Sequence, residues 1–233
     1  MSPLAWPIAA ALAHFEGTAG VPPVAVIDRA LSPLAGVRFV EAAPRGRRRG
    51  ALDRATLYDA RIVGNREVPT RAGNLHDFMN ALVWASFPRA KMAIHERQHA
   101  LIESRIEGER LPAQRTPEQD TLAMMDEGGI AIVTAEAELV EEATQNRDGG
   151  ALARLVAGGR TAAAVFGHAL FEHLARKGPL LVWGRAMILR VAALPSPVHE
   201  ADIDAQLADA IRLRHADHDA GSAPLVPSVL LPS

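Results

Sequence analysis

The stretch from residue 74 to residue 105 has the clearest pattern of hydrophobic and polar positions in the chain. Its first half places Leu75, Phe78, Met79, Leu82 and Val83 three and four positions apart. This spacing predicts the apolar face of an α-helix.

Both ends of this helix can be predicted from single residues. Asn74 is a good N-cap, and Asp77 stands three positions later, where a carboxylate strengthens the cap. Pro88 removes a backbone donor and disfavours helical geometry at Phe87. We therefore predict a long central helix that is kinked or broken between Ser86 and Pro88, with Pro88 in the first turn of its second half.

The other face of the first half carries a short polar cluster. His76, Asn80 and Trp84 are spaced by four, Asp77 lies beside them, and residues 74–86 include no Lys, Arg or Glu. A surface helix usually has long charged side chains, so both faces of this helix are expected to be covered. The cluster either lines a functional site or belongs to a buried helix. In a buried helix its polar groups would bond nearby backbone, because an unpartnered buried polar group costs about 1–3 kcal/mol.

The second half contains the sequence HERQH at residues 95–99. On a helix, the H-E-x-x-H spacing lets His95 and His99 bind zinc while Glu96 acts as general base on a metal-bound water. The charge of Arg97, the absence of a metzincin-type continuation and the lack of an obvious third ligand weaken this hypothesis. The alternative is a solvated or locally hydrogen-bonded helix face.

The rest of the chain mixes short helical and strand patterns in no regular βαβ order. We expect helices near residues 4–15, 24–31, 134–146, 149–159, 168–174 and 199–215, and strands near 38–41, 57–63, 67–70, 162–166 and 180–191. Residues 121–133 should form a β-hairpin, because two apolar runs flank the turn sequence DEGG.

These patterns predict one α+β domain spanning residues 1–233. The kinked central helix should pack on a small, mostly antiparallel sheet. Residues 219–233 are rich in proline and apolar residues. They are expected to form an extended C-terminal arm that packs on the body or on a second subunit.

Two further positions offer chemistry outside the central helix. Asp126, followed by Glu127, either serves the turn of the expected hairpin or presents a carboxylate to the central helix. His168 follows Gly167 at the start of a helix, where the dipole disfavours the cationic imidazole. A neutral His168 suits a ligand or a base, and it equally suits a core histidine with one hydrogen bond.

Composition restricts the chemistry. The chain has no cysteine, which excludes disulfides and thiolate metal sites, so zinc or another divalent metal would need histidine and carboxylate ligands. A formal charge of −2 gives no general attraction to nucleic acid, although the basic run at 44–50 is either a phosphate contact or an exposed loop. We expect a cytoplasmic protein with no membrane span, because no apolar stretch reaches about 18–20 residues and no signal peptide is evident. Its partners cannot be named from the sequence, and a homo-oligomer is compatible with it.

Several sequence motifs, in the same order as in the family, resemble those of the DUF3025 family of uncharacterised bacterial proteins. They are VPTR, NLHDFMNALVW, FPRAK, DTLAMMDEGG and FGHALFEHL, and the resemblance covers residues 58–174. It implies a soluble bacterial protein but carries no established activity. The resemblance also implies a set of residues that the family keeps fixed. In this chain they are Asn74, His76, Asp77, Asn80, Ala81, Trp84, Phe87, Pro88, Arg89, Lys91, Asp126, Glu127, Gly129, Gly167 and His168.

The resemblance counts against zinc at residues 95–99. Many family members have Asn at the position of His95, and the family pattern does not require an acid at Glu96. Catalysis in this family would instead run through His76, Asp77, Asp126 or His168.

Two hypotheses for function follow. In the first, His76, Asp77 and Asn80 form one wall of a site, His168 or Asp126 forms the other, and a metal- or His-activated water performs hydrolysis. In the second, the protein is a non-catalytic interaction module and the cluster is structural. The hydrolase hypothesis fails if the His76 and His168 side chains lie more than about 10 Å apart or are both sealed from solvent.

Overall fold

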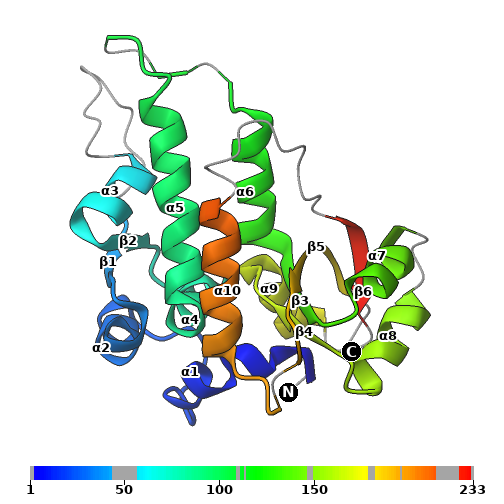
Figure 1. Cartoon of the computed structure of the whole chain (residues 1–233). Helices are drawn as coiled ribbons and strands as arrows, with labels where there is room; N and C mark the ends of the chain where they lie inside the picture. The colour runs from blue at the N-terminus through cyan, green and yellow to red at the C-terminus, as the bar shows by residue number, and fades with distance from the viewer. Residues whose placement is uncertain are drawn as a thin grey trace.

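The computed structural model describes residues 3–43, 57–108, 111–112, 114–145, 149–177, 182–194, 196–213 and 226–231. Within these residues the chain is α+β, with ten α-helices, a 3-10 helix and two small sheets (Figure 1). The predicted fold class is therefore confirmed. The basic run at 44–50 lies outside the described residues.

The N-terminal part carries the smaller sheet. Its elements are η1 (Pro3–Ile8), α1 (Ala9–Ala13), α2 (Val24–Ala35), β1 (Arg38–Glu41), α3 (Tyr58–Asn65) and β2 (Glu67–Thr70). Strands β1 and β2 pair in parallel. The strand expected at 57–63 is wrong, because this segment is helix α3. Its fully buried residue is Ile62, whereas Tyr58 at the start of the helix is exposed.

The central helix is two helices, α4 (Leu75–Ser86) and α5 (Pro88–Glu103). The break falls at Phe87, whose φ of −131° and ψ of 57° are not helical. The Asn74 side chain accepts a hydrogen bond of 3.0 Å from the Asp77 backbone, and Pro88 stands in the first turn of α5. The predicted cap and break are both confirmed.

A side chain from the far end of the sequence closes this break. Helix α10 (Glu200–Leu213) lies alongside α5 (Figure 1). The buried carboxylate of Asp204 accepts hydrogen bonds from the backbone of Ala90 at 2.8 Å and of Arg89 at 3.1 Å. The free N–H groups at the start of α5 are thus satisfied from another helix.

The larger sheet has the strand order β4-β3-β5-β6. Its strands are β3 (Gly129–Thr134), β4 (Thr161–Val165), β5 (Val182–Arg190) and β6 (Val226–Leu231). The β3–β4 and β5–β6 pairs are antiparallel and the β3–β5 pair is parallel, so the sheet is mostly antiparallel as predicted. Strand β6 is the described part of the expected C-terminal arm, and it pairs with β5 of the same chain.

The hairpin expected at 121–133 is wrong. Residues Pro117–Gly128 form helix α6, which leads directly into β3. The helix begins with a capping box, in which the side chains of Thr116 and Gln119 each bond the other's backbone. Helices α7 (Ala137–Gln145), α8 (Gly149–Ala157) and α9 (His168–Lys177) complete the described elements.

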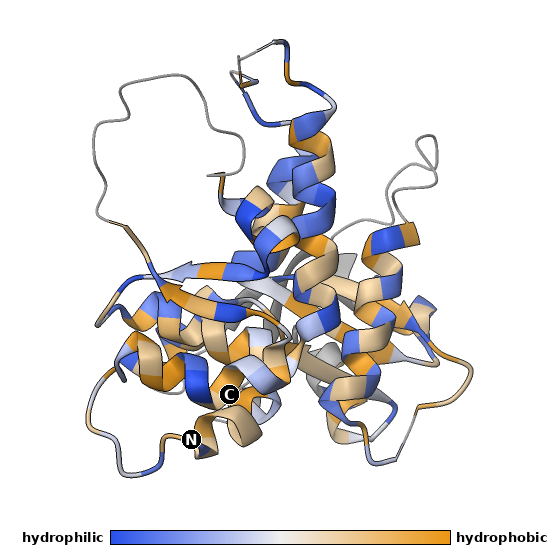
Figure 2. Ribbon diagram, turned by 90° about the vertical axis from the view of Figure 1, so that its left-hand side faces the viewer, coloured by the Kyte–Doolittle hydropathy of each residue, from blue (hydrophilic) through white to orange (hydrophobic). Residues whose placement is uncertain are grey.

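The hydropathy of the residues varies along the molecule. In Figure 2 the far end of α5, at the top of the view, is largely hydrophilic, and hydrophobic positions concentrate on the helices and strands below it. None of the described helices is both long and apolar enough to cross a bilayer.

Candidate functional site

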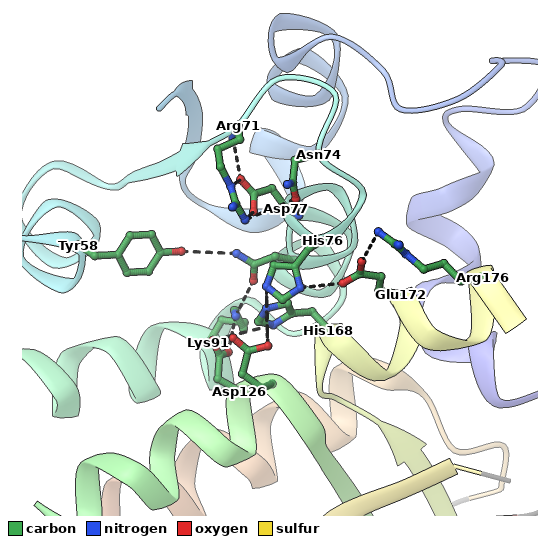
Figure 3. A network of polar contacts seen from close by, with 12 residues as sticks. Tyr58, Arg71, Asn74, His76, Asp77, Lys91, Asp126, His168, Glu172 and Arg176 are labelled. Atoms are coloured by element: carbon green, nitrogen blue, oxygen red, sulfur yellow. Dashed lines mark hydrogen bonds and ion pairs between the residues drawn. The ribbon is translucent and has the colours of Figure 1, made fainter. Parts of the chain in front are cut away.

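A polar cluster forms where four helices meet between the two sheets (Figure 3). It draws His76 and Asn80 from α4, Lys91 from α5, Asp126 and Glu127 from the end of α6, and His168 and Glu172 from α9. Four of the residues predicted from the sequence, His76, Asn80, Asp126 and His168, are therefore brought together.

The two histidines touch at their outer nitrogens. His76 Nε2 and His168 Nε2 lie 3.0 Å apart. The Oε2 atom of Glu127 lies 3.4 Å from His168 Nε2 and 3.7 Å from His76 Nε2. His168 is buried, but the side chains of His76 and Glu127 are 30% and 52% exposed. The cluster is thus compact and open to solvent on one side.

Each imidazole has a carboxylate on its inner nitrogen. His76 Nδ1 lies 2.9 Å from Glu172 Oε2, and Glu172 in turn pairs with Arg176 at 2.7 Å. His168 Nδ1 lies 3.9 Å from Asp126 Oδ2, and Asp126 pairs with the ammonium of Lys91. Two chains of cation, carboxylate and imidazole therefore converge on one point.

This arrangement bears on where the ring protons reside. The Glu172 carboxylate lies within hydrogen-bond distance of His76 Nδ1 and favours the His76 tautomer that is protonated there, which leaves a lone pair on Nε2. His168 Nδ1 has no hydrogen-bond partner in the described part of the chain, so the two Nε2 atoms, 3.0 Å apart, are joined either by a proton on His168 Nε2 or by a cation between them. Zinc–nitrogen bonds of about 2.0–2.1 Å in a tetrahedral site place two ligand nitrogens about 3.3 Å apart, close to the spacing seen here.

The electrostatics keep His168 neutral. Burial is the main cause that lowers the pKa of His168 to about 3, and Asp126 opposes the shift only in part. Burial works against the ionised form of Asp126, but the charge and hydrogen bond of Lys91, together with the charges of His168 and His95, outweigh it and hold the pKa of that carboxyl well below its usual value. Burial raises the pKa of Glu127, and the charge of Asp126 adds to the effect.

Lys91 is the buried support of the cluster. Its side chain has no exposed surface. Its Nζ donates to Asn80 Oδ1 at 2.7 Å and to Asp126, and lies 5.5 Å from the ring centre of Trp84. The chain has 23 arginines and only two lysines. The presence of a lysine rather than an arginine at this position could therefore have indicated that the position needs an ammonium group. A compact ammonium suits this space, whereas the planar guanidinium of arginine is larger.

Asp77 lies outside the donor group. Its Oδ1 and Oδ2 accept from the guanidinium of Arg71 at 2.6 and 2.9 Å, and Oδ2 also accepts from the Arg71 backbone at 2.6 Å. Burial opposes ionisation, yet these hydrogen bonds hold the pKa of Asp77 below its usual value. Asp77 thus fixes the segment that leads into α4.

His95 and Glu96 of the H-E-x-x-H sequence have other partners. His95 Nδ1 lies 2.8 Å from Asp59 Oδ1, and its ring stacks on Trp84 with a centroid distance of 5.4 Å. Glu96 pairs with Arg212 at 3.6 Å. In the described part of the chain, the group of three possible metal ligands is His76, Glu127 and His168, and it includes neither His95 nor His99. Zinc binding at residues 95–99 stays a hypothesis.

A glycine allows α9 to approach α6. A Cβ atom at Gly167 would lie 2.5 Å from the backbone oxygen of Glu127 and from backbone atoms of Gly128. The backbone N–H groups of Phe166 and Gly167 both donate to the Gly129 carbonyl, at 2.9 and 2.8 Å. This contact sets the next residue, His168, beside Asp126 and Glu127.

The residues that sequence reasoning left out of the site are Lys91, Glu127 and Glu172. Glu172 stands four positions after His168, which placed it on the same helix face without showing that it would meet His76 of α4. Glu127 was expected in a hairpin turn, and the capping box at Thr116 was the feature that predicts a helix there instead.

Comparison with protein families decides the relationship of this chain to known proteins. The family described as "Protein of unknown function (DUF3025)" matches residues 38–231. The chain belongs to the DUF3025 family. All residues of the cluster lie inside the matched region, so the site is part of the DUF3025 domain itself. Comparison with curated proteins and with solved structures gives no match.

Proposed function

We propose that this DUF3025 protein is a metal-dependent hydrolase that holds a divalent ion, zinc in the first instance, between His76, His168 and Glu127. The observation that carries the proposal is the convergence of their three donor atoms at 3.0, 3.4 and 3.7 Å. Two imidazoles and one carboxylate, with further positions left for water, form the ligand set of zinc hydrolases.

The surroundings of the donors support a metal. Glu172 lies 2.9 Å from His76 Nδ1, as the outer partner of a metal-bound histidine does, and Asp126 Oδ2 lies 3.9 Å from His168 Nδ1. The lowered pKa of His168 keeps this imidazole unprotonated and available as a ligand near neutral pH.

The chemistry follows from an ion at this place. A zinc ion lowers the pKa of a bound water to about 7 and supplies hydroxide as a nucleophile. Because Glu127 and His76 are partly exposed, water and substrate can reach the ion from the solvent side. Hydrolysis is the reaction class that needs only this nucleophile and an electrophilic substrate.

The second candidate is a non-catalytic interaction module in which the cluster is structural. The ion pair between the fully buried Lys91 and the largely buried Asp126 favours it, because such pairs also occur as internal supports. In this case His76 and His168 would share a proton instead of a metal.

Metal content separates the two candidates. Protein purified without a histidine tag and dialysed against zinc would be analysed by elemental mass spectrometry, as wild type and as His76→Ala and His168→Ala. His173→Ala, on helix α9 outside the donor group, is the matched control. We expect about one equivalent of zinc in the wild type and the control and none in the two variants.

The same measurement tests the other zinc hypothesis. A His95→Ala/His99→Ala variant should keep its metal under our proposal. Loss of metal in this variant alone would move the site to α5, and wild-type protein without metal would leave the structural interpretation in place. The metal-loaded wild type would then be assayed against chromogenic esters, amides and phosphoesters, with metal-depleted protein as the reference.

A further inference from the structure

Tyr58, the single tyrosine of the chain, stands at the edge of the cluster. It is the first residue of α3 and 42% of its surface is exposed, yet Figure 3 shows its hydroxyl pointing toward the cluster. The hydroxyl oxygen lies 3.5 Å from Asn80 Nδ2. A solvent-reachable ring thus brings a polar end to the site.

The orientation of the Asn80 amide is fixed by its other partner. Lys91 Nζ can only donate, and it bonds Asn80 Oδ1 at 2.7 Å. The amide NH₂ group therefore faces Tyr58, whose oxygen is the acceptor. Within the described residues this is the hydrogen bond that the hydroxyl makes, so its own proton is directed elsewhere.

The hydroxyl lies on the metal side of α4. Asn80 is one helical turn after His76 on the same face, a separation of about 5–6 Å between Cβ atoms. Burial of the hydroxyl end, together with the charge of Asp126, raises the pKa of Tyr58 above its usual value. Tyr58 therefore remains a hydrogen-bond donor at any ordinary pH.

Charge around the hydroxyl restricts the substrate. Five carboxylates lie at or near the site: Asp59, Asp77, Asp126, Glu127 and Glu172. Three of them pair with a cation: Asp77 with Arg71, Asp126 with Lys91 and Glu172 with Arg176. A divalent ion brings this set to formal neutrality. A site with no net charge gives a dianionic phosphate little electrostatic binding energy. A neutral acyl group needs none in order to bind, and it develops a negative charge only in the transition state, where a hydrogen-bond donor stabilises it.

We propose that Tyr58 donates the hydrogen bond that stabilises the oxyanion of a neutral acyl substrate, an amide or an ester, at this site. The inference rests on the proposed metal-dependent hydrolysis. The metal-bound water oxygen forms a bond to the acyl carbon, and the C=O electron pair moves to the oxygen that Tyr58 binds. Collapse of this intermediate breaks the bond to the leaving nitrogen or oxygen, which takes the proton of the attacking water.

The test compares wild type with Tyr58→Phe, which removes the hydroxyl and keeps the ring against His95. The probe is acetohydroxamate, a metal ligand that carries an oxygen anion, titrated calorimetrically into zinc-loaded protein. We expect one zinc equivalent in both proteins and binding about 10-fold weaker or more in Tyr58→Phe, the loss of one hydrogen bond to a charged oxygen. Glu138→Gln, whose carboxylate is exposed and pairs with Arg190, is the control and should bind as wild type does.

Inorganic phosphate, titrated in the same way, tests the substrate class and should bind more weakly than acetohydroxamate. Equal acetohydroxamate affinity in wild type and Tyr58→Phe, or no binding to zinc-loaded wild type, would overturn the role of Tyr58. Tighter binding of phosphate would overturn the acyl class. A wild type that takes up no zinc would defeat the metal proposal itself, a result distinct from zinc uptake without any effect of Tyr58.

Discussion

His76 Nε2 lies 3.0 Å from His168 Nε2, although the two residues are 92 positions apart in the chain. Helices α4 and α9 pack against each other to make this contact. Because Glu172 lies on the inner nitrogen of His76, His76 Nε2 carries a lone pair, and the contact needs either a proton on His168 Nε2 or a cation between the rings. This requirement makes the pair informative about function.

The carboxylate behind His76 should control metal affinity. Glu172→Gln removes the charge that orients the His76 ring and favours its Nδ1 proton. We expect zinc to bind about 10- to 100-fold more weakly, as for other outer partners of metal ligands, in a competition titration with a chromophoric chelator. Glu138→Gln should bind like wild type, and unchanged affinity in Glu172→Gln would show that Glu172 does not act through His76.

The close approach at Gly167 should be essential although Gly167 donates no ligand. The added Cβ of Gly167→Ala would meet backbone of Glu127 and Gly128 at 2.5 Å, so α9 or the end of α6 must move. We expect loss of zinc together with a lower urea midpoint. Gly64→Ala is the control, because its Cβ meets nothing within 4 Å and helix α3 should gain up to about 1 kcal/mol. Full zinc content in Gly167→Ala would contradict the positioning role of this contact.

Lys91 should be required for stability. Lys91→Met leaves the Asp126 carboxylate buried without its main cation, which costs about 3–5 kcal/mol and would be measured by urea denaturation. The double variant Lys91→Met/Asp126→Asn should lose less than the sum of the single variants, because it leaves no unpaired charge. Strict additivity would mean that the two residues do not stabilise each other.

The stability of the metal-free protein should fall as the solution is acidified from pH 7 to pH 4. His168 has a folded pKa of about 3, below the value of about 6.5 in an unfolded chain, so the unfolded state takes up the proton first. Its contribution to stability is present above pH 6.5 and is lost as the pH falls toward 3. His168→Gln should flatten the dependence of the urea midpoint on pH in this range, and an unchanged slope would contradict the assignment.

Local sequence patterns predicted the structural features that depend only on residues close together in the sequence. The Asn74 cap, the break at Phe87 and the burial of Asn80 and Trp84 on α4 needed only helix periodicity, the capping preference and the proline rule. His76 and Asn80 were singled out because polar residues on an otherwise apolar helix are unusual, Asp126 because it ends an apolar run, and His168 because it begins a helix after Gly167.

The errors have a common cause. Residues 121–133 were assigned to a hairpin because two apolar runs flank the glycines of DEGG, whereas the cap at Thr116 begins a helix there. Residues 57–63 were too short for their period to be clear. The partners Glu172 and Lys91 depend on how α9 and α5 meet α4 and α6. Such distant contacts leave no periodic trace in the sequence.

The hydrogen bonds from Arg89 and Ala90 to Asp204 bear on the order of events during synthesis. A chain emerging from the ribosome makes α4 and α5 long before α10 exists to hold the start of α5, two residues before Lys91. His168 also emerges well after His76, so the early chain offers only one of the two imidazoles of the proposed metal site. If the proposal holds, the metal would be acquired late in biosynthesis, after translation has passed His168.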